Sequence, residues 1–301
     1  MSVATDPISP PSLVIVRPHD PAASNRSEAG TERGPSAPTR ARRVRGVLGS
    51  LGWALLGMAV FVALWQWGAS RVDNLPSPVE TLSRLRELLA HAFRDGGPND
   101  QGVGLLLKAS LIRVFTGFAI AAVIGIPLGL AMGSSARAWK AMNPLAQFLR
   151  PVSPLAWYPI LLIVFLDASK ASVWVICLTS LWPIVLNTAA GASTVPTDQR
   201  NVAKVFRLTR RAYVRHVLVP HTLGSTITGL RLSMGTAWMV IVAVEMMSGK
   251  TGIGNYVWTQ YNAGDMSSVA ASIILIGATG LVLDMAFLRL GKAVTKQEAH
   301  S

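Results

Sequence analysis

The feature that most constrains the fold of this chain is a series of long apolar segments. Residues 48–69, 114–136 and 171–190 contain no charged side chain, and each run has about the length that an α-helix needs to cross a hydrocarbon core of roughly 30 Å. Three more apolar segments, 146–166, 223–247 and 266–283, carry few charges. We therefore expect an all-α polytopic membrane protein with six transmembrane helices.

Composition agrees with this expectation. The chain is 50% hydrophobic and only 14% charged, whereas about a quarter of the residues in a soluble domain are charged. The net charge of +13 would also suit a protein that binds nucleic acid, but the basic residues lie mainly in the segments that connect the apolar runs. We therefore predict that the lipid bilayer, and not nucleic acid, is the partner of this chain.

The same patterns divide the chain into parts and orient it. Residues 1–45 are rich in Pro, Ser and Arg, which predicts a disordered tail. Residues 46–293 form the predicted transmembrane domain, and residues 294–301 a second, cytoplasmic tail. With the N-terminus in the cytoplasm, basic residues on the cytoplasmic side outnumber those outside by roughly two to one, as the positive-inside rule requires.

A basic loop at residues 196–220 falls on the cytoplasmic side in this orientation. Val202, Val205 and Phe206 recur at i, i+3 and i+4, so a short helix here carries an apolar stripe with the small Ala203 beside it. Such a stripe must be buried, and a groove on a partner protein is suited to it. The alternative is a basic linker that only satisfies the topology rule.

Motifs for catalysis or metal binding are missing from the sequence. Residues 248–251 resemble the end of a phosphate-binding P-loop, but the position of its first glycine is Val244 and no strand precedes it. No two histidines have the spacing of one helix face, and Cys177 is the single cysteine. We expect no enzyme activity, no metal and no cofactor, so that ATP hydrolysis falls to a separate subunit. A secondary carrier driven by an ion gradient is the alternative from another class.

Polar side chains in the fifth apolar segment are candidates for a translocation path: Arg231, Ser233, Thr236, Trp238 and Glu245. For each of these residues, the alternative to a place on the path is a purely structural role. Arg231 and Glu245 are too far apart along one helix to pair. We expect Glu245 to bond the backbone of the next loop and Arg231 to serve as an anchor near the cytoplasmic end.

A small-xxx-small pattern marks the second apolar segment, where Gly125, Gly129 and Gly133 recur at every fourth position. Such a stripe lets two helices approach closely. Packing inside this chain is the favoured interpretation, and a subunit interface is the alternative.

The basic loop resembles the EAA loop of ABC importer permeases. The matching positions are Asn201, Val202 and Ala203 for E-A-A, Arg207 for the following Gly, and Val217, Val219 and Pro220 for the I-x-L-P end. Asn in place of Glu and Arg in place of Gly depart from the general pattern and are similar to what the nitrate-type branch carries. Other stretches that resemble this branch of the nitrate/sulfonate/taurine permeases are residues 110–118, 125–129, 150–157, 182–189, 229–238, 245–254 and 280–284.

This resemblance implies the fold of a type I ABC importer permease in a bacterial inner membrane, working as a homodimer. It implies cytoplasmic ATPase subunits and a periplasmic substrate-binding protein as partners. The residues that it implies for coupling to the ATPase are Asn201, Val202, Ala203, Val205, Phe206, Arg207, Leu208 and Thr209. The implied substrate is a small anion, with nitrate (or nitrite or cyanate) first and bicarbonate, taurine and other sulfonates as alternatives.

Overall fold

The computed structural model describes residues 40–97 and 101–298, and every named element in these ranges is a helix. The predicted tail lies outside the described residues up to position 39. Helix α1 begins at Arg40 and ends at Ala69, so residues 40–45 are helical and not part of a disordered tail. The chain divides into two compact units, residues 1–60 and 61–301. The larger unit carries all the elements discussed below.

The larger unit contains ten α-helices after the end of α1 and one π-helical turn among the described residues. In chain order they are α2 (Pro78–Ala90), α3 (Val103–Ser134), α4 (Ala136–Leu149), α5 (Pro154–Phe165), α6 (Ala168–Ser193), α7 (Thr197–Val205), α8 (Arg210–Tyr213), the π-turn Val214–Leu218, α9 (Val219–Ser248), α10 (Ile253–Asn262) and α11 (Met266–Glu298).

Among the residues that the structure describes, five helices, α1, α3, α6, α9 and α11, are long and apolar enough to cross a membrane. The pair α4 and α5 passes the same test together but is bent by 97°, which gives up to six spans. The all-α prediction is confirmed. The third predicted span, however, is broken and not one continuous helix.

Prolines explain the break. Pro151 and Pro154 have no N–H to donate to a preceding turn, and Ser153 between them has an extended backbone with ψ of 126°. Helix α4 therefore ends at Leu149, and α5 begins at Pro154, the first helical position, where the missing N–H costs nothing.

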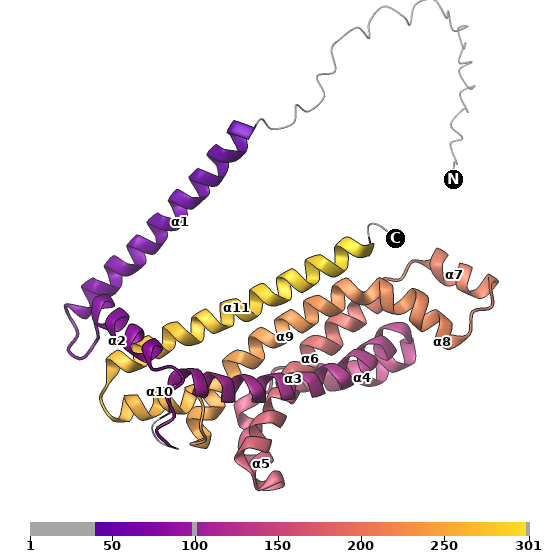
Figure 1. Ribbon diagram of the computed structural model, residues 1–301. Coiled ribbons are helices and arrows are strands. Elements are labelled where there is room, and N and C mark those ends of the chain that lie inside the picture. The colour runs from indigo at the N-terminus through magenta and orange to yellow at the C-terminus, as the bar shows by residue number, and fades with distance from the viewer. Residues whose placement is uncertain (1–39, 98–100, 299–301) are drawn as a thin grey trace, which may run out of the picture. The chain divides into compact units, whose positions relative to one another are not determined.

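The core of the larger unit forms where α6 packs between α3 and α9 (Figure 1). The glycines of α3 make this packing close. A Cβ on Gly129 would lie 2.6 Å from Cβ of Thr188, and one on Gly133 would collide with the carbonyl of Ala189. The stripe of glycines thus faces α6 of the same chain, as expected where helices approach without side chains between them.

Helix α2 is the amphipathic helix of the long connection between α1 and α3. Its first turn carries a capping box, in which Ser77 and Glu80 exchange side-chain and backbone hydrogen bonds. Leu85 and Leu88 pack on the buried cluster around Trp238, whereas Leu82 and Leu89 are exposed. This helix lies at the end of the bundle that also carries α10, which we call the α10 end; the opposite end, with α7 and α8, is the α7 end.

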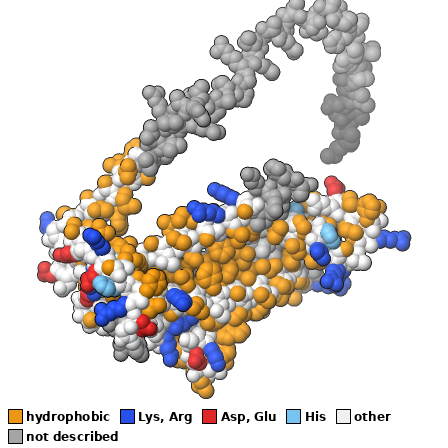
Figure 2. All heavy atoms as spheres, in the orientation of Figure 1, with side chains coloured by type: hydrophobic (Ala, Val, Ile, Leu, Met, Phe, Trp, Pro, Cys, Tyr) orange, Lys and Arg blue, Asp and Glu red, His pale blue; other side chains and the backbone are white. Residues whose placement is uncertain are grey.

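The surface of the larger unit follows the pattern of a membrane protein. On the face drawn in Figure 2, hydrophobic side chains cover the middle of the bundle, and most Lys and Arg side chains gather toward the two ends. Long apolar helices with charged ends are the arrangement that a bilayer requires of a spanning bundle.

Candidate functional site

Helix α7 presents apolar side chains to the surroundings at the α7 end. Val205 and Phe206 are 78% and 74% exposed, and Val202 is 55% exposed. Asn201 is exposed as well, but Ala203 is buried inside the chain at 7%. The exposed patch on this loop is therefore made by Val202, Val205 and Phe206, while Ala203 belongs to the packing of the loop itself.

Helix α7 ends in a left-handed turn at Arg207. The backbone N–H of Arg207 donates to the carbonyl of Lys204, and that of Leu208 donates to the carbonyl of Ala203, both at 3.0 Å. This pair of bonds is a Schellman motif, and Arg207 occupies its left-handed position with φ of 47°. The arginine thus stands at the one position of the motif where glycine is favoured, and it adopts the glycine-like conformation.

Replacement of Arg207 by glycine is expected to stabilise this turn. A left-handed conformation costs an L-residue about 1–2 kcal/mol, and part of this gain is lost because glycine has more freedom when unfolded, so the net gain is up to about 1 kcal/mol. Hydrogen exchange at the amide of Leu208 should slow by up to about fivefold in the purified protein.

The matched control is Lys204→Gly, which places glycine at a helical position of the same turn. It is expected to speed exchange at the same amide, because glycine inside a helix destabilises it by about 0.5–1 kcal/mol. Faster exchange in Arg207→Gly would show that the turn does not depend on the left-handed residue.

A small buried cluster holds the loop on the bundle. Ala192, Val195 and Leu218 are buried together, with Tyr213 and Val217 packed against them. Thr209 begins α8 by accepting a hydrogen bond on its hydroxyl from the N–H of Ala212 at 3.3 Å. From Arg210 the chain continues through the π-turn into α9, so one helical path of 39 residues runs to Ser248. Helix α8 is therefore continuous with α9, and α7 is separated from it by one short turn.

Glu245, near the other end of α9, is fully buried in a polar network. One carboxylate oxygen accepts hydrogen bonds from the Ser110 hydroxyl at 2.8 Å and the Gly254 N–H at 3.1 Å. The other oxygen pairs with the Arg113 guanidinium at 2.8 Å. Arg113 also donates to the carbonyl of Thr251 at 2.7 Å. The network therefore ties α3, α9 and the loop before α10 together.

The loop between α9 and α10 is shaped to this carboxylate. A Cβ on Gly252 would collide with the carboxylate of Glu245, and one on Gly254 would collide with the carbonyl of Val242. The N–H of Ile253 donates to the Ser110 hydroxyl at 3.1 Å. Gly252 lets the backbone approach the carboxylate, and Gly254 lets the start of α10 approach the backbone of α9. Glu245 thus bonds the backbone in the first turn of α10, directly after the loop, and both of its oxygens have partners.

Two other residues expected on a path lie elsewhere. Arg231 forms a bidentate pair with Asp284 of α11, with distances of 2.6 and 2.9 Å. Trp238 is buried, and its indole N–H donates to the carbonyl of Ile276 at 3.0 Å. A Cβ on Gly280 would touch this indole at 3.1 Å. Arg231 and Trp238 therefore join α9 to α11.

A groove of about 730 Å³ lies beside the middle of α6, and we call it the mid-bundle groove. The residues of its wall come from the α4–α5 break, from α6 and from α9, and those with polar groups are Arg150, Trp157, Thr179, Trp182, Asn187 and Thr236. Thr236 is the one of the five path candidates that lines it. Ser233 is buried, and its hydroxyl has no hydrogen-bond partner among the described residues.

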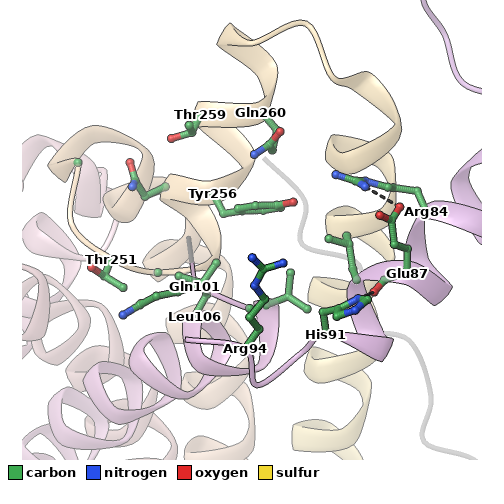
Figure 3. A pocket seen from close by; sticks show the side chains of 16 residues that line it. Arg84, Glu87, His91, Arg94, Gln101, Leu106, Thr251, Tyr256, Thr259 and Gln260 are labelled. Carbon is green, nitrogen blue, oxygen red and sulfur yellow. Dashed lines mark hydrogen bonds and ion pairs between the residues drawn. The ribbon is translucent and has the colours of Figure 1, made fainter. Parts of the chain in front are cut away.

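A second, more polar pocket of about 520 Å³ opens at the α10 end (Figure 3). Helix α2 contributes Arg84 and Glu87, and His91 follows its last residue. Tyr256 projects between α10 and the side chain of Arg94. Arg84 pairs with Glu87 at 2.6 Å, and this hydrogen bond raises the pKa of the guanidinium.

Arg84 also ties α2 to the start of α11. It donates to the Ser268 hydroxyl at 2.7 Å and lies 3.4 Å from Asp265. Partial burial raises the pKa of the Asp265 carboxyl, but hydrogen bonds from Ser268 and the charge of Arg84 outweigh it, so that the pKa lies below its ordinary value. Asp265 is therefore ionised and caps α11 through the N–H of Ser268.

Sequence reasoning missed two of these roles. The sequence offers no sign of the role of Arg113, because its partner Glu245 lies 132 positions away in the chain. Apolarity of the third predicted span gives Arg150 no role, whereas it stands in the wall of a groove at the middle of α6. The signal that could have found Arg150 is the pair of prolines that follow it, since they predict a break in the span.

Comparisons with known proteins agree with this architecture. Residues 125–296 match the family described as "Binding-protein-dependent transport system inner membrane component". The nitrate import permease protein NrtB of Synechocystis sp. is 42% identical over 236 residues, which are 77% of this chain and 86% of that protein. The bicarbonate transport system permease protein CmpB of Synechococcus elongatus is 40% identical over 258 residues, 84% of this chain and 93% of that protein.

Solved structures support the fold. The permease fold in inward-facing structures of the MetNI methionine ABC transporter matches with a TM-score of 0.55 at 16% identity, covering 62% of this chain and 93% of that chain. At this identity the likeness concerns the fold alone. The family match covers more than half of the chain, and the resemblance found in the loop and span motifs is confirmed. This chain belongs to the binding-protein-dependent transport system inner membrane components, the permease subunits of ABC importers.

Proposed function

We propose that this chain is the membrane subunit of an ATP-driven importer for a small oxyanion, with nitrate as the first candidate. The observation that carries the proposal is the exposed apolar patch of Val202, Val205 and Phe206 on a basic loop. Three large apolar side chains with this exposure need a protein partner, because the loop lies beyond the ends of the spanning helices. Its occupant is the ATPase subunit.

The orientation follows from charge. The α7 end lies in the cytoplasm, together with the N-terminus, because the basic residues of residues 196–220 gather there. The α10 end, with the polar pocket around Tyr256, then faces the periplasm and receives the substrate-binding protein. The residues that couple the chain to the ATPase lie on α7 and the turn after it: Asn201, Val202, Ala203, Val205, Phe206, Arg207, Leu208 and Thr209. Ala203 contributes through the packing of the loop and not by direct contact.

Force is transmitted through α9. The unbroken helical path from Arg210 to Ser248 connects the docking loop to Thr236 in the mid-bundle groove and to Glu245 at the periplasmic end. When ATP draws two docked ATPase subunits together, the α7 helices of two permease copies move with them. The long helix then carries this displacement to the groove, which opens to the periplasmic side, and hydrolysis resets it.

The substrate is proposed from the relatives together with the groove. Nitrate and bicarbonate are the anions in the printed names of relatives that are 38–42% identical to this chain. Both are small, planar and trigonal, and no carboxylate lines the mid-bundle groove. Nitrate leads because NrtB of Synechocystis sp. has the higher identity of the two proteins compared above. Taurine and other sulfonates are the second candidate class of substrate. The alternative to an importer is a secondary carrier driven by an ion gradient.

Uptake in cells that lack this gene tests the proposal. Labelled nitrate and labelled bicarbonate are offered separately at micromolar concentration, with and without the wild-type gene, and unlabelled taurine is added as a competitor. The expected result is nitrate uptake that depends on the gene and is abolished by depletion of ATP. Uptake that persists without ATP and follows an ion gradient would identify a secondary carrier instead, and inhibition by taurine would move the substrate to sulfonates.

A further inference from the structure

Arg150 stands at a place where a membrane protein rarely puts a charge. It follows the last residue of α4, at the 97° break before α5, and lines the mid-bundle groove. Trp182, on the same wall, lies about 21 Å from the start of α6, close to the middle of that helix. The groove is therefore at mid-depth of the spanning bundle, where an ionised side chain needs a partner or a wet cavity.

Two arginines that lie well inside the spanning bundle, Arg113 and Arg231, have acidic partners, but Arg150 does not. Arg113 pairs with Glu245, and Arg231 pairs with Asp284. No hydrogen bond or ion pair of the Arg150 side chain exists with any residue that the structure describes, and the side chain is exposed. A guanidinium that is kept at this depth without a carboxylate leaves all of its donors available to something that enters the groove.

The rest of the groove wall suits an anion with few hydrogen-bonding atoms. Two half-buried indoles, Trp157 and Trp182, can only donate hydrogen bonds, and no acidic side chain is present. The amide of Asn187 and the hydroxyl of Thr236 bond carbonyls of their own helices, at Pro183 and Ser233, so they add polarity without adding charge. At about 730 Å³ the groove is much larger than one trigonal oxyanion, which fits a wet passage better than a tight binding site.

We propose that Arg150 is the charge-selecting residue of the translocation path, and that its guanidinium binds the passing oxyanion in the mid-bundle groove. The planar fork of guanidinium donors matches two oxygens of a trigonal anion such as nitrate or bicarbonate. The assignment rests on the proposed importer function. It adds a residue that the anion contacts within the membrane, one that is not among the five path candidates expected from the sequence.

The test uses the complete transporter, with its ATPase and binding protein, in liposomes that report uptake of labelled nitrate or bicarbonate. Arg150→Gln is expected to lower uptake about tenfold to a hundredfold, the value of a charge-assisted hydrogen bond. ATP hydrolysis stimulated by the binding protein should persist, because the coupling loop is untouched. The matched control is Arg137→Gln, the same change in the first turn of α4, about 20 Å along the helix, which should leave uptake unchanged.

Restoring the positive charge at position 150 by chemical modification distinguishes a role of Arg150 in anion selection from a role in folding. Arg150→Cys is modified with aminoethyl methanethiosulfonate, which adds a cation, or with sulfonatoethyl methanethiosulfonate, which adds an anion of similar size. Cys177, the single native cysteine, is buried, and unmodified wild-type chain serves to check that it does not react. The cationic adduct is expected to regain uptake and the anionic adduct to stay inactive.

Four results are informative. Equal uptake by the two adducts, whether high or low, overturns the role of the charge, as does Arg150→Gln with wild-type uptake. Wild-type complex that transports neither anion refutes the proposed function itself, and the inference falls with it. Wild-type uptake together with the predicted loss and rescue supports both.

Discussion

Phe206→Asp is expected to abolish binding of the ATPase subunit while the permease still folds and inserts. Phe206 is 74% exposed at the tip of α7, and no buried cluster of the chain includes it. In a docked complex it becomes a buried aromatic anchor, and truncation of such an anchor costs about 2 kcal/mol or more, roughly thirtyfold in affinity. A carboxylate forced into the same apolar contact adds a desolvation cost.

Copurification of the ATPase with a tagged permease measures this effect, and uptake by the complemented strain measures its consequence. The matched control is Phe93→Asp, since Phe93 is 77% exposed but lies at the α10 end. It should retain the ATPase. Ala203→Asp is less informative, because Ala203 is buried and its substitution disturbs the loop as well as the docking surface. Retention of the ATPase by Phe206→Asp at wild-type level would remove α7 from the proposed interface.

Much of the fold could be predicted because the bilayer imposes simple rules. Long apolar runs are expected to cross the bilayer as helices. Accordingly, the spanning helices α1, α3, α6, α9 and α11 coincide with five of the six predicted segments. The stripe of Val202, Val205 and Phe206 predicted the short helix of the basic loop. These are local patterns, and local patterns are what a sequence displays directly.

The break between α4 and α5 was missed for a physical reason. Apolarity alone made residues 146–166 resemble one span, and it outweighed the prolines at 151 and 154. A proline can kink a membrane helix or end it, and neighbouring helices decide between these outcomes by satisfying the freed carbonyls. The sequence shows the prolines but not those neighbours, so the break and the position of Arg150 could only be seen in the structure.

The polar residues of the fifth span show the same limit. Periodicity says that Arg231, Thr236, Trp238 and Glu245 lie on a helix, but not which neighbour each one faces. The structure places Arg231 against Asp284, Trp238 against α11 and Glu245 against Arg113, and leaves Thr236 in the groove. Pairs that are 53 and 132 positions apart leave no local trace in a single sequence.

Glu245→Gln is expected to lower the free energy of unfolding by about 3–5 kcal/mol, the cost of removing one partner from a buried ion pair. The glutamine keeps the volume of the side chain and can still accept a hydrogen bond from Ser110 or Gly254. It removes the charge that compensates Arg113, whose side chain is only 14% exposed. Unfolding by SDS in mixed micelles measures the difference.

Two variants decide whether this large effect comes from the buried charge. Glu87→Gln breaks the ion pair of Arg84 with a carboxylate that is 60% exposed, and should cost less than about 1 kcal/mol. The double variant Arg113→Met with Glu245→Met removes both charges. Its loss of unfolding free energy should be smaller than the sum of the losses in Arg113→Met and Glu245→Met alone, because it leaves neither charge buried without a partner. If Glu245→Gln lowers the free energy of unfolding no more than Glu87→Gln does, Arg113 is solvated or pairs with another group when its carboxylate is absent. The ion pair would then not be what holds the loop before α10. In the proposed mechanism a fixed loop at the α10 end and a movable docking loop at the α7 end let α9 act as a lever, so the strength of this ion pair tests that mechanism as well.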